Sequence, residues 1–145
     1  MKDQKNVTDN IPRFKKELLS LFKRCPAIQS AYLFGSVAVG HAGPKSDIDI
    51  AIRCDPELPS ESFFDLRLEL MDKLENIFEV QTDIVVLNLA SLVMIRQVLT
   101  HGVLLYARNS EKEHAWAIQK RKEYFDFKYY LDRNRKELKS YFGVT

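Results

Sequence analysis

The chain has 145 residues, of which 46% are hydrophobic and 29% charged, and its formal net charge at pH 7 is +2. This length provides for one domain with one hydrophobic core. The small net charge gives no electrostatic reason to expect nucleic-acid binding, and no apolar run approaches the roughly 20 residues of a membrane-spanning helix. We therefore expect a single domain over residues 1–145 that binds neither nucleic acid nor a membrane.

The start of the chain and its cysteines favour a cytoplasmic protein. The first ten residues, MKDQKNVTDN, lack the apolar segment of a signal peptide. Cys25 and Cys54 are far apart and form no metal-ligand pattern with the three histidines. Free thiols are typical of a reducing compartment, and a cytoplasmic location is the expectation.

The first elements are predicted to be a helix and two strands. Asn10 caps the first helix in this interpretation, and apolar residues at helical spacing continue to Phe22. The helix ends before Pro26, because the residue that precedes a proline is pushed out of the helical region. Residues 28–34 form an apolar strand, and a second strand follows a Gly-Ser turn and a polar connection.

Helix and strand patterns alternate in the middle of the chain. Either Ser60 or Ser62 opens a second helix, and residues 80–87 form a third strand. Residues 92–100 form a short helix that ends at Gly102. Residues 103–107 form a fourth strand, which we expect at an edge of the sheet. The second helix should bury a stripe of five residues, namely Phe63, Leu66, Leu70, Leu74 and Ile77.

A long helix is predicted over residues 110–142, with Asn134 interrupting its apolar row. Its aromatic residues outnumber what one packed face of a terminal helix needs. Two interpretations remain open: the helix covers the sheet, or part of it docks onto a partner. Its basic residues alternate with acidic ones, which is typical of a solvated face and not of a nucleic-acid patch.

The second strand carries two carboxylates, Asp47 and Asp49. Side chains alternate along a strand, so the two share one face while Ile48 and Ile50 pack into the core from the other. Two carboxylates on one face can hold a hard divalent cation. Upstream, the N–H groups of Gly35-Ser36 and the serine hydroxyl suit an anion. Each feature alone is ordinary, because a D-x-D is usually a solvated face and a Gly-Ser usually a turn with an N-cap.

Asp83 is an acidic residue inside the short apolar third strand. It either faces water at a sheet edge, or it lies beside the second strand, which carries Asp47 and Asp49, and faces these two residues. In the second interpretation it is a third carboxylate of the site, and the remaining alternatives are Glu79 or no third carboxylate. His41 and His101 are candidate bases, although a histidine in a loop or near a helix end is more often incidental.

Gly35-Ser36, ten further residues and then Asp47-Ile48-Asp49 match the GS-x10-D-x-D signature, and the chain resembles the polymerase-beta-like nucleotidyltransferase superfamily. The resemblance implies an α/β (α+β) minimal nucleotidyltransferase fold: a small mixed sheet of about four strands flanked by helices, with a long C-terminal helix. The core would span about residues 11–107 and the C-terminal helical segment about 110–142.

Within that superfamily the small chain resembles the minimal nucleotidyltransferase (MNT) component of HEPN–MNT toxin–antitoxin pairs. This likeness implies an antitoxin that transfers AMP from ATP to a tyrosine of a HEPN ribonuclease toxin and so neutralises it. Two alternatives stay open. One is a free-standing nucleotidyltransferase acting on a small-molecule hydroxyl, and the other is an antitoxin that only masks the toxin sterically.

The family resemblance also assigns roles. Asp47 and Asp49 would bind the magnesium ion that escorts the triphosphate, and Asp83 would help hold a second ion and take the proton of the acceptor hydroxyl. Gly35 and Ser36 would bind the β- and γ-phosphates of ATP.

The resemblance leaves two further points open, namely the role of Ser46 and the cation that contacts the leaving pyrophosphate. Ser46 would orient the carboxylates or touch the triphosphate. Many family members carry an arginine or an aromatic residue just after the Gly-Ser pair, where this chain has Val37, Ala38 and Val39. The cation for the leaving pyrophosphate is therefore unassigned, with Lys45 or Arg53 as candidates.

Overall fold

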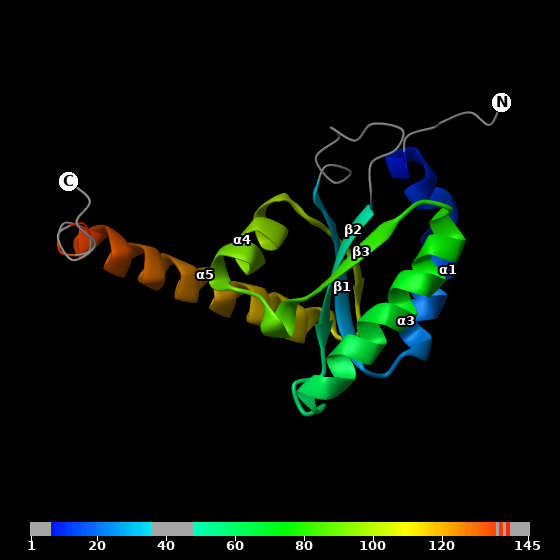
Figure 1. Cartoon of the computed structure of the whole chain (residues 1–145), viewed down its shortest axis with the longest axis horizontal. Helices are drawn as coiled ribbons and strands as arrows, with labels where there is room; N and C mark the ends of the chain where they lie inside the picture. Colours follow the sequence, from blue (N-terminus) through cyan, green and yellow to red (C-terminus); the bar gives the residue numbers. More distant parts are fainter. Residues whose placement is uncertain (1–6, 36–47, 136, 138, 140–145) are drawn as a thin grey trace.

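The computed structural model describes residues 7–35, 48–135, 137 and 139 (Figure 1). These residues form helices and strands in the following order: α1 (Val7–Arg24), β1 (Ile28–Phe34), β2 (Ile48–Cys54), α3 (Ser60–Phe78), β3 (Thr82–Val86), the short 3-10 helix η1 (Leu87–Leu89), α4 (Leu92–His101), β4 (Val103–Ala107) and α5 (Ser110–Arg133).

The four strands form one mixed sheet in the order β3-β2-β1-β4. The central strand β1 is antiparallel to both β2 and β4, whereas β2 and β3 are parallel. A parallel pair needs a crossover connection, and α3 provides it. The mixed four-stranded sheet and the edge position of β4 confirm the expectation from sequence.

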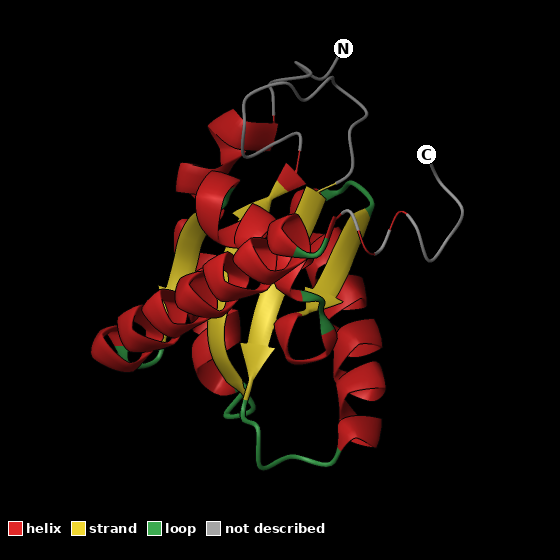
Figure 2. Cartoon of the chain, turned by 90° about the vertical axis from the view of Figure 1, so that its left-hand side faces the viewer, coloured by secondary structure: helices red, strands yellow, loops and turns green. Residues whose placement is uncertain are grey.

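Helices cover both faces of the sheet (Figures 1 and 2). The isoleucines of β2, Ile48, Ile50 and Ile52, are fully buried on the face that packs against α1 and α3. On the opposite face Tyr32 and Ala51 pack with side chains of α4 and α5. Because side chains alternate along a strand, Asp49 and Asp83 project from this second face.

Most element boundaries follow the sequence pattern. The first strand agrees at both ends, and the buried stripe of α3 is confirmed, with Leu66 and Ile77 partly buried beside the core. One prediction is wrong: α1 begins at Val7 and includes Asn10. The low helix preference of asparagine amounts to less than about 1 kcal/mol, which neighbouring helical turns override. The third strand is shorter than expected, since Leu87 already begins η1.

The helix α5 packs against α4 as far as Tyr124, whose ring lies against the Arg96 guanidinium, and its last turns extend away from the rest of the protein (Figure 1). Glu113 and Ala117 near its start are buried. Further along, Phe125, Tyr129 and Tyr130 are 58%, 68% and 62% exposed. The helix ends at Arg133, consistent with the interruption expected at Asn134. Neither α5 nor any other helix among the described residues is long and apolar enough to cross a bilayer.

Candidate active site

The end of β1 brings Gly35 against Asp49. Phe34, the last residue of β1, is the antiparallel partner of Asp49. Gly35 has a φ of +76°, a left-handed conformation that glycine adopts readily. A Cβ atom at this position would lie 2.2 Å from Asp49 Oδ2. The backbone of Gly35 therefore lies directly beside a carboxylate, which a side chain at this position would push aside.

The parallel pairing of β2 and β3 places Asp83 beside Asp49. The two residues are register partners, and neighbouring strands lie about 4.8 Å apart. Both side chains therefore emerge side by side from the same face of the sheet. This confirms the interpretation in which the third strand lies next to the motif strand, whereas the role of Asp83 as a third carboxylate stays a prediction.

Several predicted site residues lie outside the described residues, namely Ser36, Ser46, Asp47 and Lys45. Their roles stay predictions. Within the described part of the chain, no group of three or more metal-ligating side chains comes together. The carboxylate pair Asp49–Asp83 is what this part contributes to the predicted metal site.

This carboxylate pair fits a magnesium ion by its chemistry. Carboxylate oxygens are the ligands that magnesium takes from proteins. Two adjacent carboxylates also repel each other, and a cation between them relieves that repulsion. Asp83, whose side chain is 50% exposed, can be reached from solvent.

Arg67 of α3 supplies a positive charge to this site that the sequence analysis missed. Its Nη2 lies 3.2 Å from Asp83 Oδ1. Because α3 covers the opposite face of the sheet, the arginine side chain passes the outer edge of β3 to reach the carboxylate. No sequence signal identifies this contact, since the two residues belong to different elements and are far outside the i, i+4 spacing.

Arg53, one of the candidates for the pyrophosphate cation, has a different role. Its Nε donates to Glu113 Oε2 at 2.8 Å, and its Nη2 donates to the same oxygen. Ser30 and Tyr32 donate to the other carboxylate oxygen. This network ties α5 to the sheet, and burial raises the pKa of Tyr32 well above its usual value. No spacing in the sequence indicated this role of Glu113, which is buried.

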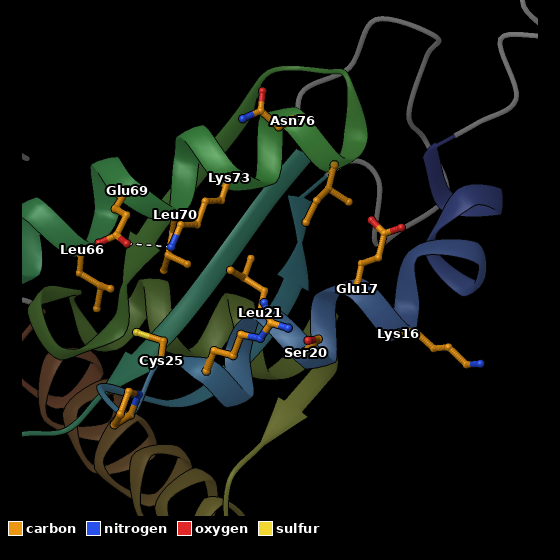
Figure 3. A pocket seen from close by; sticks show the side chains of 13 residues that line it. Lys16, Glu17, Ser20, Leu21, Cys25, Leu66, Glu69, Leu70, Lys73 and Asn76 are labelled. Atoms are coloured by element: carbon orange, nitrogen blue, oxygen red, sulfur yellow. Dashed lines mark hydrogen bonds and ion pairs between the residues drawn. The ribbon is translucent and has the colours of Figure 1, made fainter.

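An open groove of about 690 Å³ lies between α1 and α3 (Figure 3). Its wall is mainly apolar, with Leu21, Leu66 and Leu70, and Lys73 pairs with Glu69 at its rim. The groove lies on the face of the sheet opposite to Asp49 and Asp83. It is therefore separate from the carboxylate pair.

A mixed four-stranded sheet with adjacent carboxylates on β2 and β3 and a glycine backbone beside them is the arrangement expected of nucleotidyltransferases. A family model described as "Polymerase beta, Nucleotidyltransferase" matches residues 16–111, and the chain belongs to this family. The superfamily resemblance read from the Gly-Ser and D-x-D motif is thereby confirmed.

A similar protein makes the resemblance more specific than the family alone. The protein adenylyltransferase MntA of Shewanella oneidensis is 36% identical over 88 residues, which make up 61% of this chain and 60% of that protein. The chain thus matches less than two thirds of this relative's length. The resemblance to minimal nucleotidyltransferase antitoxins is confirmed by this match and by solved structures.

Two of these structures are informative. A toxin–antitoxin crystal structure with AMP-PNP is similar with a TM-score of 0.69 and 27% identity, covering 86% of this chain and 97% of that one. A complex of a tri-AMPylated Shewanella oneidensis HEPN toxin with an MNT antitoxin has a TM-score of 0.65 and 25% identity, covering 88% and 97% of the two chains.

Proposed function

We propose that this protein is a magnesium-dependent protein adenylyltransferase that transfers AMP from ATP to a tyrosine of a HEPN-family toxin and so neutralises it. The observation that carries the chemistry is the adjacent pair Asp49 and Asp83, beside the backbone of Gly35, in a member of a nucleotidyltransferase family. The choice of acceptor is supported by the MntA relative and by the tri-AMPylated toxin in a similar complex.

ATP is the proposed nucleotide, a choice supported by the similar toxin–antitoxin structure that contains AMP-PNP. Gly35 and Ser36 would bind its phosphates, with Ser46 beside them. Asp47, Asp49 and Asp83 would hold magnesium, in a two-ion arrangement. When bound, magnesium supplies positive charge that offsets the negative charge of the phosphates.

The transfer itself needs a base and an aligned acceptor. The tyrosine oxygen forms a bond to the α-phosphorus of ATP, and the bond from that phosphorus to the bridging oxygen of the leaving pyrophosphate breaks. The proton of the tyrosine hydroxyl passes to Asp83, which is the carboxylate nearest the sheet edge and half exposed. The N–H groups around Gly35 would orient the triphosphate for this attack.

The outer half of α5 is the proposed docking element for the toxin. Exposed aromatic side chains occur there on more than one side of the helix, at Phe125, Phe127, Tyr129 and Tyr130. Aromatic residues are enriched at protein–protein interfaces, and an apolar surface of this kind marks an interaction site. Docking here would raise the effective concentration of the target hydroxyl near Asp83.

A cytoplasmic location belongs to the same proposal. Cys25 and Cys54 are both free thiols, and thiols persist in a reducing compartment. A nucleotide-dependent enzyme also needs ATP around it.

The experiment that tests the function uses the full chain, its HEPN-type partner, ATP and magnesium. Intact-mass spectrometry should show one or more adenylyl groups on the partner, and none with the Asp49→Asn variant. A partner that binds without changing mass would replace catalysis with steric masking. Transfer to a small hydroxyl compound, with the partner unmodified, would instead favour the free-standing enzyme.

A further inference from the structure

Two arginine–carboxylate pairs on this protein are built in different ways. Arg53 and Glu113 are 15% and 3% exposed, and Arg53 donates through two nitrogens. Arg67 and Asp83 are 42% and 50% exposed and share one contact of 3.2 Å. The first pair is buried and multiply bonded, as a permanent structural connection should be. The second is open to solvent and singly bonded.

Arg67 has a further hydrogen-bond donor, Nε, besides the nitrogen that contacts Asp83. Its Nε is shut off from solvent and has no hydrogen-bond partner within the described part of the chain. Leaving a buried N–H group unpaired costs free energy. Arg67 thus holds Asp83 through one contact of 3.2 Å, and its Nε donor has no partner among the described residues. We therefore expect this ion pair to break easily when another cation competes for Asp83.

The position of Asp83 beside Asp49 explains why a cation near these carboxylates is stabilising. Asp83 is the register partner of Asp49, and two adjacent carboxylates destabilise each other when both are charged. In a protein without bound metal, Arg67 offsets part of this repulsion. A divalent cation would do the same with twice the charge and would compete for the same carboxylate oxygen.

We propose that Arg67 is a displaceable counter-cation, which pairs with Asp83 in the metal-free protein and yields it to a divalent metal ion. The inference rests on the proposed function only in taking Asp83 as a metal ligand. Arg67 acts through Asp83 and is therefore a positioning residue. Its presence makes metal binding at Asp83 weaker than the carboxylates alone would give.

Manganese binding tests the inference without any measurement of activity. Manganese(II) replaces magnesium as a spectroscopic probe, and its binding to the full chain is followed by electron paramagnetic resonance. Arg67→Gln removes the charge and keeps most of the side chain. We expect the Arg67→Gln variant to bind manganese about two- to fivefold more tightly than the wild type, because a partly exposed ion pair contributes only modestly to the binding equilibrium.

A matched control and a double variant make the result specific. Lys73→Gln removes one positive charge from the same helix, but Lys73 pairs with Glu69 and lines the groove on the other side. It should leave manganese affinity unchanged. In an Asp83→Asn background, Arg67→Gln should also have no effect, because the carboxylate for which the two cations compete is gone.

Three outcomes would overturn the inference. These are weaker or unchanged manganese binding by Arg67→Gln, an equal gain from Lys73→Gln, or full manganese binding by Asp83→Asn. The proposed function can fail separately: an unmodified HEPN partner, together with tighter manganese binding by Arg67→Gln, would discard the transfer reaction and keep the role of Arg67.

Discussion

Gly35 and Asp49 lie so close that a Cβ atom on the glycine would come within 2.2 Å of the carboxylate oxygen Oδ2. We expect Gly35→Ala to lose ATP binding, because Asp49 must move to make room. The left-handed backbone adds about 1–2 kcal/mol of strain for a residue with a Cβ. Thermal unfolding should show this destabilisation, and calorimetry with a non-hydrolysable ATP analogue should show the lost binding. An alanine variant with unchanged nucleotide affinity would contradict the assignment of Gly35 to the site.

The carboxylates should differ in their roles when each is neutralised. Asp49→Asn should abolish transfer with the fold intact, because a metal ligand is lost and like-charge repulsion is relieved. Asp83→Asn should also abolish transfer but keep part of the nucleotide binding, since its role lies on the acceptor side. Calorimetry with ATP, with and without magnesium, and circular dichroism check these points. Equal ATP affinity with and without magnesium would argue against metal-assisted binding.

The buried Glu113 should matter for stability. Glu113→Gln removes the negative charge opposite Arg53, whose side chain is only 15% exposed, and leaves a largely buried cation without its partner. We expect the free energy of unfolding in urea to fall by about 3 kcal/mol. Glu123→Gln, at a partly exposed pair with Lys120 on the same helix, should change it by less than about 1 kcal/mol. Similar losses for both variants would mean that the Glu113 network contributes no special stability.

The two cysteines should react at different rates. Burial raises the pKa of the Cys54 thiol to about 12, so at pH 8 it is almost entirely protonated and unreactive. Cys25 is only partly buried and serves as the internal control. Iodoacetamide at pH 8 should modify Cys25 first, as followed by peptide mass spectrometry.

The same shift links stability to pH. Cys54 ionises near pH 8.5 in the unfolded chain but only near pH 12 in the folded one. The folded state therefore holds the proton longer, and this contribution to stability is complete below about pH 8 and declines as the pH rises. Cys54→Ser should flatten the decline between pH 8 and pH 10 in a urea-unfolding series.

The exposed aromatic residues of α5 should matter for partner binding and not for folding. Truncation after Lys122 removes Phe125, Tyr129 and Tyr130 and leaves the buried Glu113 and Ala117 in place. We expect the thermal unfolding temperature to change little while affinity for the HEPN partner falls at least tenfold, as for loss of an interface anchor. Lys128→Ala, an exposed change on the same part of the helix, is the control for a nonspecific effect.

Sequence patterns predicted the parts of this fold that depend on local spacing. The strand 28–34 and the stripe around Leu70 follow from alternation and helical periodicity. The two interpretations of Asp83 both describe part of what the structure shows: β3 lies at the edge of the sheet, where Asp83 is half exposed, and it also lies beside β2, where Asp83 is the register partner of Asp49. By contrast, Arg67 and Asp83, like Arg53 and Glu113, meet across different elements. Such contacts depend on how the elements pack, for which the residue pattern carries no direct signal.

The parallel pairing of β2 and β3 has a consequence for how the site assembles during folding. Strands β1 and β2 are antiparallel neighbours along the chain, whereas Asp49 and Asp83 are separated by the whole of α3. Contacts between residues distant in sequence require costly loop closure and so tend to form late. A partly folded chain would therefore hold Gly35 next to Asp49 before Asp83 arrives. Competence for metal-assisted chemistry thus comes only after the crossover helix has docked, and not with the pairing of β1 and β2 alone.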